Sequence, residues 1–318
     1  KQLKSAYRGN PSPSSDKNNQ NVLYRPVPAF EYEQTTSRHF LSANIKTEIG
    51  EGFLLRANGK YYLGGYTNQD FEVSGVLNIP LNVSTSFPVS FRVNGGFYKK
   101  TPEFMYQKYL SNHFKWDNSF ADETSLWFNP VINLSNTNLG MQLALTDGYT
   151  YFDTNQEPTQ VTRPIKLMSA YVKQQLKFWK FHVDHQAVLQ FTDDREIWQV
   201  PFVSYHNSLY FQSVIVENAL KVQVGTDFYF HSAFYVPAYN PATDQFYRQN
   251  EKKVGDYPYV DVFVNAKWKR TRIFAKFEHL NSLAIPGLGL RGDNSFSALH
   301  YPLDKWSIKV GVGWTFYN

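Results

Sequence analysis

Three groups of residues in this chain of 318 amino acids carry side chains that could do chemistry, and the first resembles a metal site. His182, Asp184 and His185 lie close together, and imidazole and carboxylate groups are ligands of zinc. The surrounding residues alternate between apolar and polar types, which is typical of a β-strand. On a strand, His182 and Asp184 point to one face and His185 points to the other. The three side chains therefore cannot share an ion, and we expect no metal site here.

The second group could support acid–base chemistry at one end of the predicted strands. It comprises Asp193, Asp194, His206 and His231. A hydrolytic site needs a nucleophile, a base and an orienting group in a recognisable arrangement, and no such motif surrounds these residues. The third group, the glycines near residue 290, does not lead from a strand into a helix, so it forms no phosphate-binding loop. We expect no catalytic residue and no cofactor.

The composition excludes several other classes of protein. No cysteine is present, which excludes disulfide scaffolds, thiolate metal sites and cysteine nucleophiles. Aromatic residues make up 17% of the chain and charged residues only 19%, an unusual balance for a soluble domain. The formal net charge is +5, but the basic residues are scattered rather than clustered, so we expect no nucleic-acid partner. No apolar run approaches the roughly 18 residues of a transmembrane helix.

The informative pattern is an alternation with a period of two residues. Near the C-terminus, Trp306, Ile308, Val310, Val312 and Trp314 share one face, and the residues between them are small or polar. Alternate side chains of a strand point to opposite faces, so this segment predicts a strand with one apolar side. It is about as long as a tilted strand must be to cross a bilayer.

The same alternation predicts thirteen strands, and no stretch carries a convincing helical pattern. The strands are expected at 38–49, 53–63, 70–81, 88–98, 124–134, 139–152, 166–177, 181–191, 203–216, 219–236, 259–269, 272–280 and 305–316. Connections are short around 50–52, 82–87, 135–138, 178–180, 217–218 and 270–271, and mostly long around 64–69, 99–123, 153–165, 192–202, 237–258 and 281–304. Short and long connections therefore alternate, as they do in membrane barrels with tight periplasmic turns and long outer loops.

These observations predict an all-β fold, a transmembrane antiparallel up-and-down β-barrel. Bacterial barrels are usually even-numbered, so we expect about fourteen strands, with twelve or sixteen as alternatives. Residues 22–30 (VLYRPVPAF) are the candidate for the fourteenth, although two prolines make them a poor strand. Residues 1–20 are expected to be a polar tail or loop and 21–318 a single barrel domain. The sequence leaves open whether residues 1–37 complete the wall.

Aromatic residues fall near both predicted ends of the strands, as expected for side chains at the two interfaces of a bilayer. At the outer ends we expect Phe71, Phe97, Phe191, Phe234, Tyr259 and Trp306. At the inner ends we expect Trp179, Trp268, Trp314 and Phe316.

If the apolar faces meet lipid, the alternate positions line the interior. That assignment places twelve cations inside: Lys46, Arg56, Lys60, Arg92, Lys173, Lys177, Lys221, Lys267, Lys269, Arg272, Lys276 and Lys309. It places six anions there: Glu48, Glu72, Asp184, Asp227, Asp261 and Glu278. Among these, we expect the pore lining to include Lys46, Arg56, Lys60, Glu72, Arg92, Lys173, Lys221, Asp227, Lys267, Lys276 and Lys309.

The cationic excess has two interpretations. Rings of positive side chains would give a water-filled lumen a mild preference for anions. Alternatively, the charges pair across strands and fill the interior with salt bridges. Eight-stranded barrels are filled by side chains and barrels of sixteen to eighteen strands are open, so fourteen strands lie between the two. A long loop that folds inward, especially 99–123 or 237–258, would decide between them.

The C-terminal part of the chain also resembles a known family. The quoted segments are 239–258 (YNPATDQFYRQNEKKVGDYP), 259–270 (YVDVFVNAKWKR), 271–281 (TRIFAKFEHLN), 300–302 (HYP) and 309–318 (KVGVGWTFYN). They resemble the putative porin family of Bacteroidota outer membranes, most densely over residues 195–318, and 108–120 (KYLSNHFKWDNSF) is similar as well. The resemblance implies an outer-membrane β-barrel that acts as a diffusion channel, and it brings no catalytic motif.

Three functions follow from these patterns. The first is a porin for small hydrophilic solutes in a bacterial outer membrane, with its C-terminus in the periplasm and lipid and lipopolysaccharide around it. The second is a non-conducting barrel that serves as a structural or accessory subunit of a larger outer-membrane complex. The third is a soluble carbohydrate-binding sandwich, which would stay in solution without detergent; an apolar belt on every strand is too large for a soluble monomer to expose.

Overall fold

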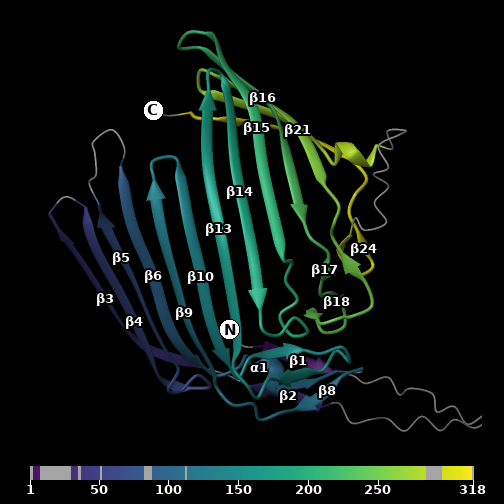
Figure 1. Ribbon diagram of the computed structural model, residues 1–318. Coiled ribbons are helices and arrows are strands. Elements are labelled where there is room, and N and C mark those ends of the chain that lie inside the picture. The colour runs from purple at the N-terminus through teal and green to yellow at the C-terminus, as the bar shows by residue number, and fades with distance from the viewer. Residues whose placement is uncertain are drawn as a thin grey trace, which may run out of the picture.

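The computed structural model describes residues 3–7, 30–34, 37–50, 52–81, 88–111, 113–283 and 296–316, and most of them belong to one antiparallel sheet (Figure 1). The sheet has thirteen strands, and each pairs with its neighbour in the chain order of the long strands. These strands are β3 (Arg38–Ile49), β4 (Phe53–Gly65), β5 (Phe71–Pro80), β6 (Val89–Lys100), β9 (Glu123–Leu134), β10 (Thr137–Asp147), β13 (Ile165–Phe178), β14 (Phe181–Thr192), β15 (Val203–Val216), β16 (Leu220–His231), β21 (Tyr259–Trp268), β22 (Thr271–Glu278) and β25 (Ser307–Trp314).

All thirteen strands predicted from the alternation are present, in the predicted order and with nearly the predicted ends. The largest differences are at 139–152 and 219–236. In the first, β10 stops at Asp147 and a separate short strand, β11 (Thr150–Phe152), follows. In the second, β16 stops at His231 and the separate strand β17 (Phe234–Tyr235) follows. Gly148 causes the first break, because its positive φ of 69° bends the chain out of the sheet. The all-β, antiparallel meander is therefore confirmed.

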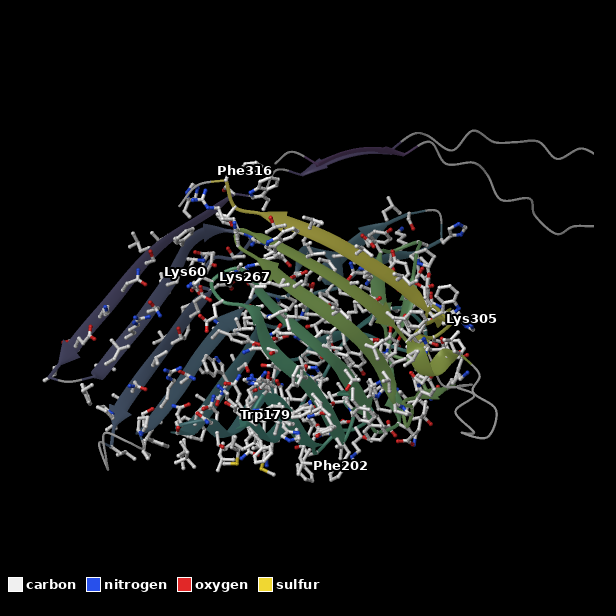
Figure 2. The ribbon with its side chains drawn as sticks, turned by 90° about the horizontal axis from the view of Figure 1, so that it is seen from above. Lys60, Trp179, Phe202, Lys267, Lys305 and Phe316 are labelled. Carbon is white, nitrogen blue, oxygen red and sulfur yellow. The ribbon has the colours of Figure 1, made fainter. Side chains whose placement is uncertain are left out.

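The predicted connection 82–87 lies outside the described residues. The other short connections are tight hairpin turns that gather at one end of the sheet, which we call the short-turn end. Leu134 pairs with Thr137 and Phe178 with Phe181, so both turns contain two residues. Two-residue hairpin loops require positive φ, and Ser135 and Trp179 adopt φ values of 44° and 52°. Figure 2 looks down on this end, where Trp179, Lys267 and Phe316 come from different parts of the curved sheet.

One face of the sheet is apolar and exposed. On β25, Ile308, Val310 and Val312 are all more than 60% exposed, and they alternate with Lys309, Gly311 and Gly313. The same apolar parity continues across the sheet, for example through Leu41 and Ile45 on β3. We call this the outer face and the opposite one the inner face.

Aromatic rings mark the short-turn end of the outer face. Trp179, Trp268, Trp314 and Phe316 lie there and are each more than 60% exposed, as predicted. Tyr259 differs from the prediction, because its register partner is Tyr229 and its ring stacks on His279 at 4.5 Å between centroids. It therefore belongs to the inner face, since a shift of one residue moves a side chain to the other side of a strand.

Among the described residues, the sheet has two free edges, β3 and β25, and is not closed (Figure 1). Both strands run toward the short-turn end, because thirteen antiparallel strands give the first and last the same direction. Residues 22–29 of the proposed fourteenth strand lie outside the described residues. Phe30, its last residue, begins β2 (Phe30–Gln34), which pairs with β1 (Leu3–Tyr7) in a separate two-stranded sheet.

The long connections carry short elements. Apart from β11 and β17, which fall within the predicted strands 139–152 and 219–236, the alternation did not predict these elements. They are the single-turn helix α1 (Phe104–Gln107), β7 (Lys108–Leu110), β8 (Lys115–Asp117), β11, β12 (Pro158–Gln160), β17 (Phe234–Tyr235), β18 (Ala238–Asn240), β19 (Gln245–Tyr247), β20 (Lys253–Val254), the 3-10 turn η1 (Leu280–Ser282), β23 (Phe296–Ala298) and β24 (Tyr301–Pro302). No helix in the described ranges is long and apolar enough to cross a membrane.

The apolar core lies among these loops rather than within the sheet. We define the loop cap as residues 101–122, 148–164, 193–202, 232–258 and 296–306. The buried apolar residues of the described chain are in the cap, apart from Val131 and from Ile165, the first residue of β13: Trp116, Phe152, Val161, Ala238, Val254, Ala298 and Leu299. The cap is therefore a folded unit at the end of the sheet opposite the short turns (Figure 1).

The packing of Phe152 predicts how the cap can be loosened. This ring is 3% exposed and contacts Tyr106 and Trp116 at centroid distances of 5.0 and 5.7 Å. We expect Phe152→Ala to lower the opening free energy of the cap by about 3–5 kcal/mol, because a buried phenyl ring is lost. Hydrogen exchange in detergent measures this as faster exchange of cap amides. Phe178→Ala is the control, since Phe178 is 81% exposed and should leave cap exchange unchanged. Unchanged cap protection in both variants would contradict the packing described here.

Candidate functional site

The inner face carries the charged residues that the sequence assigned to a pore lining. Directly paired residues on neighbouring strands lie on one face of a sheet. The register pairs Lys46 with Arg56, Lys60 with Glu72, and Lys276 with Lys309. It also aligns Asp227 with Asp261. The register thus places predicted lining residues from different strands on a common face.

A three-residue charge cluster lies on the inner face of β16, β21 and β22. Lys276 Nζ is 2.8 Å from Asp261 Oδ2 and 3.2 Å from Asp227 Oδ2. The Asp261 side chain is only 3% exposed, and its other oxygen, Oδ1, accepts a hydrogen bond from the His279 backbone N–H at 2.8 Å. A buried carboxylate requires a partner charge and hydrogen bonds, and Lys276 and His279 supply both. The two aspartates would repel each other without the lysine between them.

His279 connects this cluster to the loops. The residue has a left-handed backbone with φ of 55°, which ends β22 and turns the ring toward the cap. One ring nitrogen, Nε2, lies 2.7 Å from the Tyr257 hydroxyl, and the other, Nδ1, lies 2.6 Å from the Asp304 carbonyl oxygen. Because Nδ1 must donate to the carbonyl, a neutral ring accepts from Tyr257 at Nε2. His279 therefore fixes two long loops to the end of one strand.

Three further ion pairs hold predicted lining residues. Lys60 Nζ lies 3.5 Å from Glu72 Oε1, across β4 and β5. Lys309 Nζ lies 2.8 Å from Glu278 Oε2, which also accepts a hydrogen bond from Ser307. The Lys46–Glu48 pair, at 3.5 Å, is more than half exposed on both sides and contributes little.

The remaining predicted cations have no ion pair among the described residues. They are Arg56, Arg92, Lys173, Lys221 and Lys267. Most of them lie in the half of the inner face next to the short turns, whereas the Lys60 and Lys276 pairs lie in the half next to the loop cap. The inner face is thus charge-balanced near the cap and basic near the short turns.

The loop cap is joined by buried polar side chains. Gln249 is 2% exposed and uses its whole amide group: Nε2 donates to the Val236 and Lys252 carbonyls, and Oε1 accepts from the Glu251 and Lys252 N–H groups. A fully satisfied buried amide stabilises one loop conformation, because any other would leave polar atoms unpaired.

The two loops that could decide between an open and a constricted lumen contact each other. The Tyr109 hydroxyl donates to the Ala242 carbonyl at 3.0 Å, and the Gln245 amide lies 3.5 Å from the Met105 sulfur. Burial in this contact region raises the pKa of Tyr106 to about 12. Loops 99–123 and 237–258 therefore form one packed structure at the cap end of the inner face.

The residues considered for metal or acid–base chemistry do not converge. His185 Nδ1 lies 2.8 Å from the Tyr205 hydroxyl and 3.0 Å from Asn207 Nδ2, whereas the ring of His182 stacks on Tyr210. Over the described ranges, no group of three or more histidine, aspartate or glutamate side chains could hold a metal ion.

The acid–base candidates have separate partners. Asp194 forms an ion pair with Arg163, and Asp193 accepts a hydrogen bond from the Lys166 N–H. The ring of His206 stacks on Tyr229 at 4.5 Å, and His231 Nδ1 lies near its neighbouring carbonyl oxygen.

The sequence did not single out His279, Gln249 or Asp304, although all three organise the inner face or the cap. The only sequence signal for His279 was a histidine at the end of a predicted strand, next to a long loop. This pattern is too common to indicate that the histidine joins two loops. Their roles depend on contacts between distant segments.

Comparison with known proteins adds one finding. A family model described as "Putative porin" matches residues 3–318, almost the whole chain. No curated protein and no solved structure matches this chain.

The Lys276 cluster predicts a stability test. We expect Lys276→Met to lower the free energy of unfolding by about 2–3 kcal/mol, since it leaves two inward carboxylates without a cation. The double variant Lys276→Met/Asp261→Asn should lose less than the sum of the two single variants, because the residues are coupled. Urea unfolding in detergent, followed by tryptophan fluorescence, measures each change. Lys46→Met, from an exposed pair, is the control with an expected change near zero; strictly additive losses would show that Lys276 and Asp261 do not interact.

Proposed function

The chain belongs to the putative porin family, and from that premise we propose that it forms an outer-membrane channel for small hydrophilic solutes. Solutes would cross by passive diffusion along the inner face of the sheet, with a mild preference for anions. The chain itself would supply the channel as a single barrel domain over residues 21–318.

The observation that carries this proposal is the division of the sheet into two faces. The outer face exposes apolar side chains on strand after strand, and the inner face holds the charges. A soluble monomer rarely exposes a continuous apolar surface of this extent. In a bilayer the same apolar surface contacts lipid, and the charges on the opposite face contact water.

The difference between the two ends of the sheet supports an orientation in the membrane. Membrane barrels place short turns in the periplasm and long loops outside the cell. On this basis the short-turn end, with Trp314 and the C-terminus, faces the periplasm, and the loop cap faces outward. Outer-membrane lipid and lipopolysaccharide would surround the apolar face, and other outer-membrane proteins could contact the cap.

Closure of the wall is part of the proposal. An open sheet edge does not persist in hydrocarbon, because its backbone N–H and C=O groups have no partner there. Since β3 and β25 run in the same direction, one additional strand between them would restore antiparallel pairing on both sides. We propose that residues 22–30 supply this strand, which gives a barrel of fourteen.

Conductance tests the channel. In a planar bilayer with a salt gradient, we expect discrete steps and a reversal potential that indicates anion preference. Arg56→Glu and Arg92→Glu should shift selectivity toward cations, because neither arginine has an ion-pair partner among the described residues. Lys60→Glu should act similarly but would also repel Glu72, its present partner.

The control variant is Lys115→Glu, which makes the same charge change in β8 of the cap and should leave the ion selectivity unchanged. Selectivity that is the same in the wild type and all three lining variants would exclude an aqueous route past these residues.

A second function is favoured by the loop cap. Its buried core and its contacts between loops 99–123 and 237–258 would narrow the outer opening and present a rigid surface. The alternative is a non-conducting barrel that acts as an accessory subunit of an outer-membrane complex. Absence of conductance from protein that is folded and inserted in the bilayer, together with stable co-purification of partners, would favour this alternative.

Cysteine cross-linking tests closure, and the cysteine-free chain offers a clean background. One cysteine replaces Val310 on β25, and a second is placed at each of residues 22–30 in turn. A disulfide requires Cα atoms within about 7 Å, so we expect an intramolecular cross-link at alternate positions only. The pair Ile45→Cys and Val310→Cys tests direct contact of β3 with β25 and should not cross-link. Cross-linking of that pair instead would indicate a wall of thirteen strands, and cross-links between chains would indicate pairing with a second copy.

A further inference from the structure

Three cations on the inner face form a row at the short-turn end, which we call the basic row: Lys221, Lys267 and Arg272. They lie on consecutive strands, β16, β21 and β22. The register pairs Lys221 with Lys267, and Lys267 with Arg272. Each is the second residue from the turn end of its strand, so the three side chains lie at one level near the mouth.

The basic row lacks the counter-ions that Lys60, Lys276 and Lys309 have on the inner face. Within the described ranges, none of its three side chains lies within ion-pair distance of a carboxylate. The inward carboxylates on β16 and β21, Asp227 and Asp261, are bound to Lys276 farther along the strands. Glu217, in the turn before β16, forms no ion pair within the described part either.

The surroundings leave room for a ligand beside the row. Arg272 is paired with Gly313 on β25, and a side chain added at Gly313 would meet no atom within 4 Å. All three basic side chains are exposed. Two more cations, Lys269 and Arg270, form the turn between β21 and β22.

Like charges directly opposite each other destabilise a sheet. Two successive like-charged pairs without a counter-ion are therefore unfavourable for folding, whereas an anion bound between them would remove the repulsion. Neighbouring strands are about 4.8 Å apart, so the row spans about 10 Å, which suits an anion with several charges rather than a chloride ion. Lysine supplies point charges, and the arginine fork can bind two oxygens of a phosphate at once.

We propose that Lys221, Lys267 and Arg272 bind phosphate-bearing solutes at the short-turn mouth of the channel. This proposal rests on the inner face being the water-filled side of the sheet, as the proposed function requires. It goes beyond a general anion preference, because it assigns recognition of multivalent anions to one site. Solutes that carry a diphosphate or several phosphate groups fit the row best.

Equilibrium binding tests the site without requiring conductance. Isothermal titration of the full chain in detergent at low salt uses pyrophosphate as the probe. We expect the triple variant Lys221→Gln/Lys267→Gln/Arg272→Gln to bind at least about tenfold more weakly than the wild type. The charge-matched triple variant Lys46→Gln/Lys60→Gln/Lys173→Gln should stay within about twofold. The single variant Arg272→Lys retains the charge but loses the fork, so its affinity should lie between those of the wild type and the basic-row triple variant.

Each outcome bears on the proposal. Equal losses in the two triple variants would show that affinity comes from overall charge, and absence of wild-type binding would overturn the site. The basic-row variant removes repulsion, so it should remain folded, which circular dichroism in detergent verifies. Bilayer recordings separate the two proposals. Pyrophosphate binding by a silent protein would support the site and count against the channel, whereas a conducting protein that does not bind pyrophosphate would support the channel and reject the site.

Discussion

The structure depends on one geometric constraint, the alternation of side chains along an extended strand. Every second residue faces the same way, so a chain that alternates apolar and polar residues builds a sheet with two unlike surfaces. Because all thirteen long strands keep the same phase, their apolar sides add up to one continuous outer face. The charges collect on the other side for the same reason. Both the membrane proposal and the lumen proposal follow from this phase.

The same constraint explains what the sequence could predict. The alternation identified all thirteen strands of the sheet, and short gaps between them, such as 178–180, identified the hairpins. Parity also assigned Lys60, Glu72 and Asp227 to one face. Parity cannot say which residues are neighbours, however, because that depends on register. The contact of Lys276 with Asp261 and the position of Tyr259 opposite Tyr229 therefore needed the structure.

The loop cap was beyond prediction for a different reason. Its strands are two or three residues long, too short to display a period. Gln249 illustrates the difficulty, since its amide is satisfied by backbone atoms of a loop whose path no local pattern specifies. Loops with this many polar residues usually indicate segments that are exposed to solvent. Here they enclose the buried apolar residues Trp116 and Phe152.

The two parts of the molecule also differ in the chain distances that their contacts join, and this difference implies an order of folding. Each long strand pairs with the next one along the chain, so the sheet can grow hairpin by hairpin with little loss of loop entropy. The cap joins Met105 to Gln245, which are 140 residues apart. Such contacts are unfavourable until the intervening strands have brought the two loops to the same end of the sheet. The cap therefore forms late, and a chain whose sheet is incomplete cannot bring these loops together.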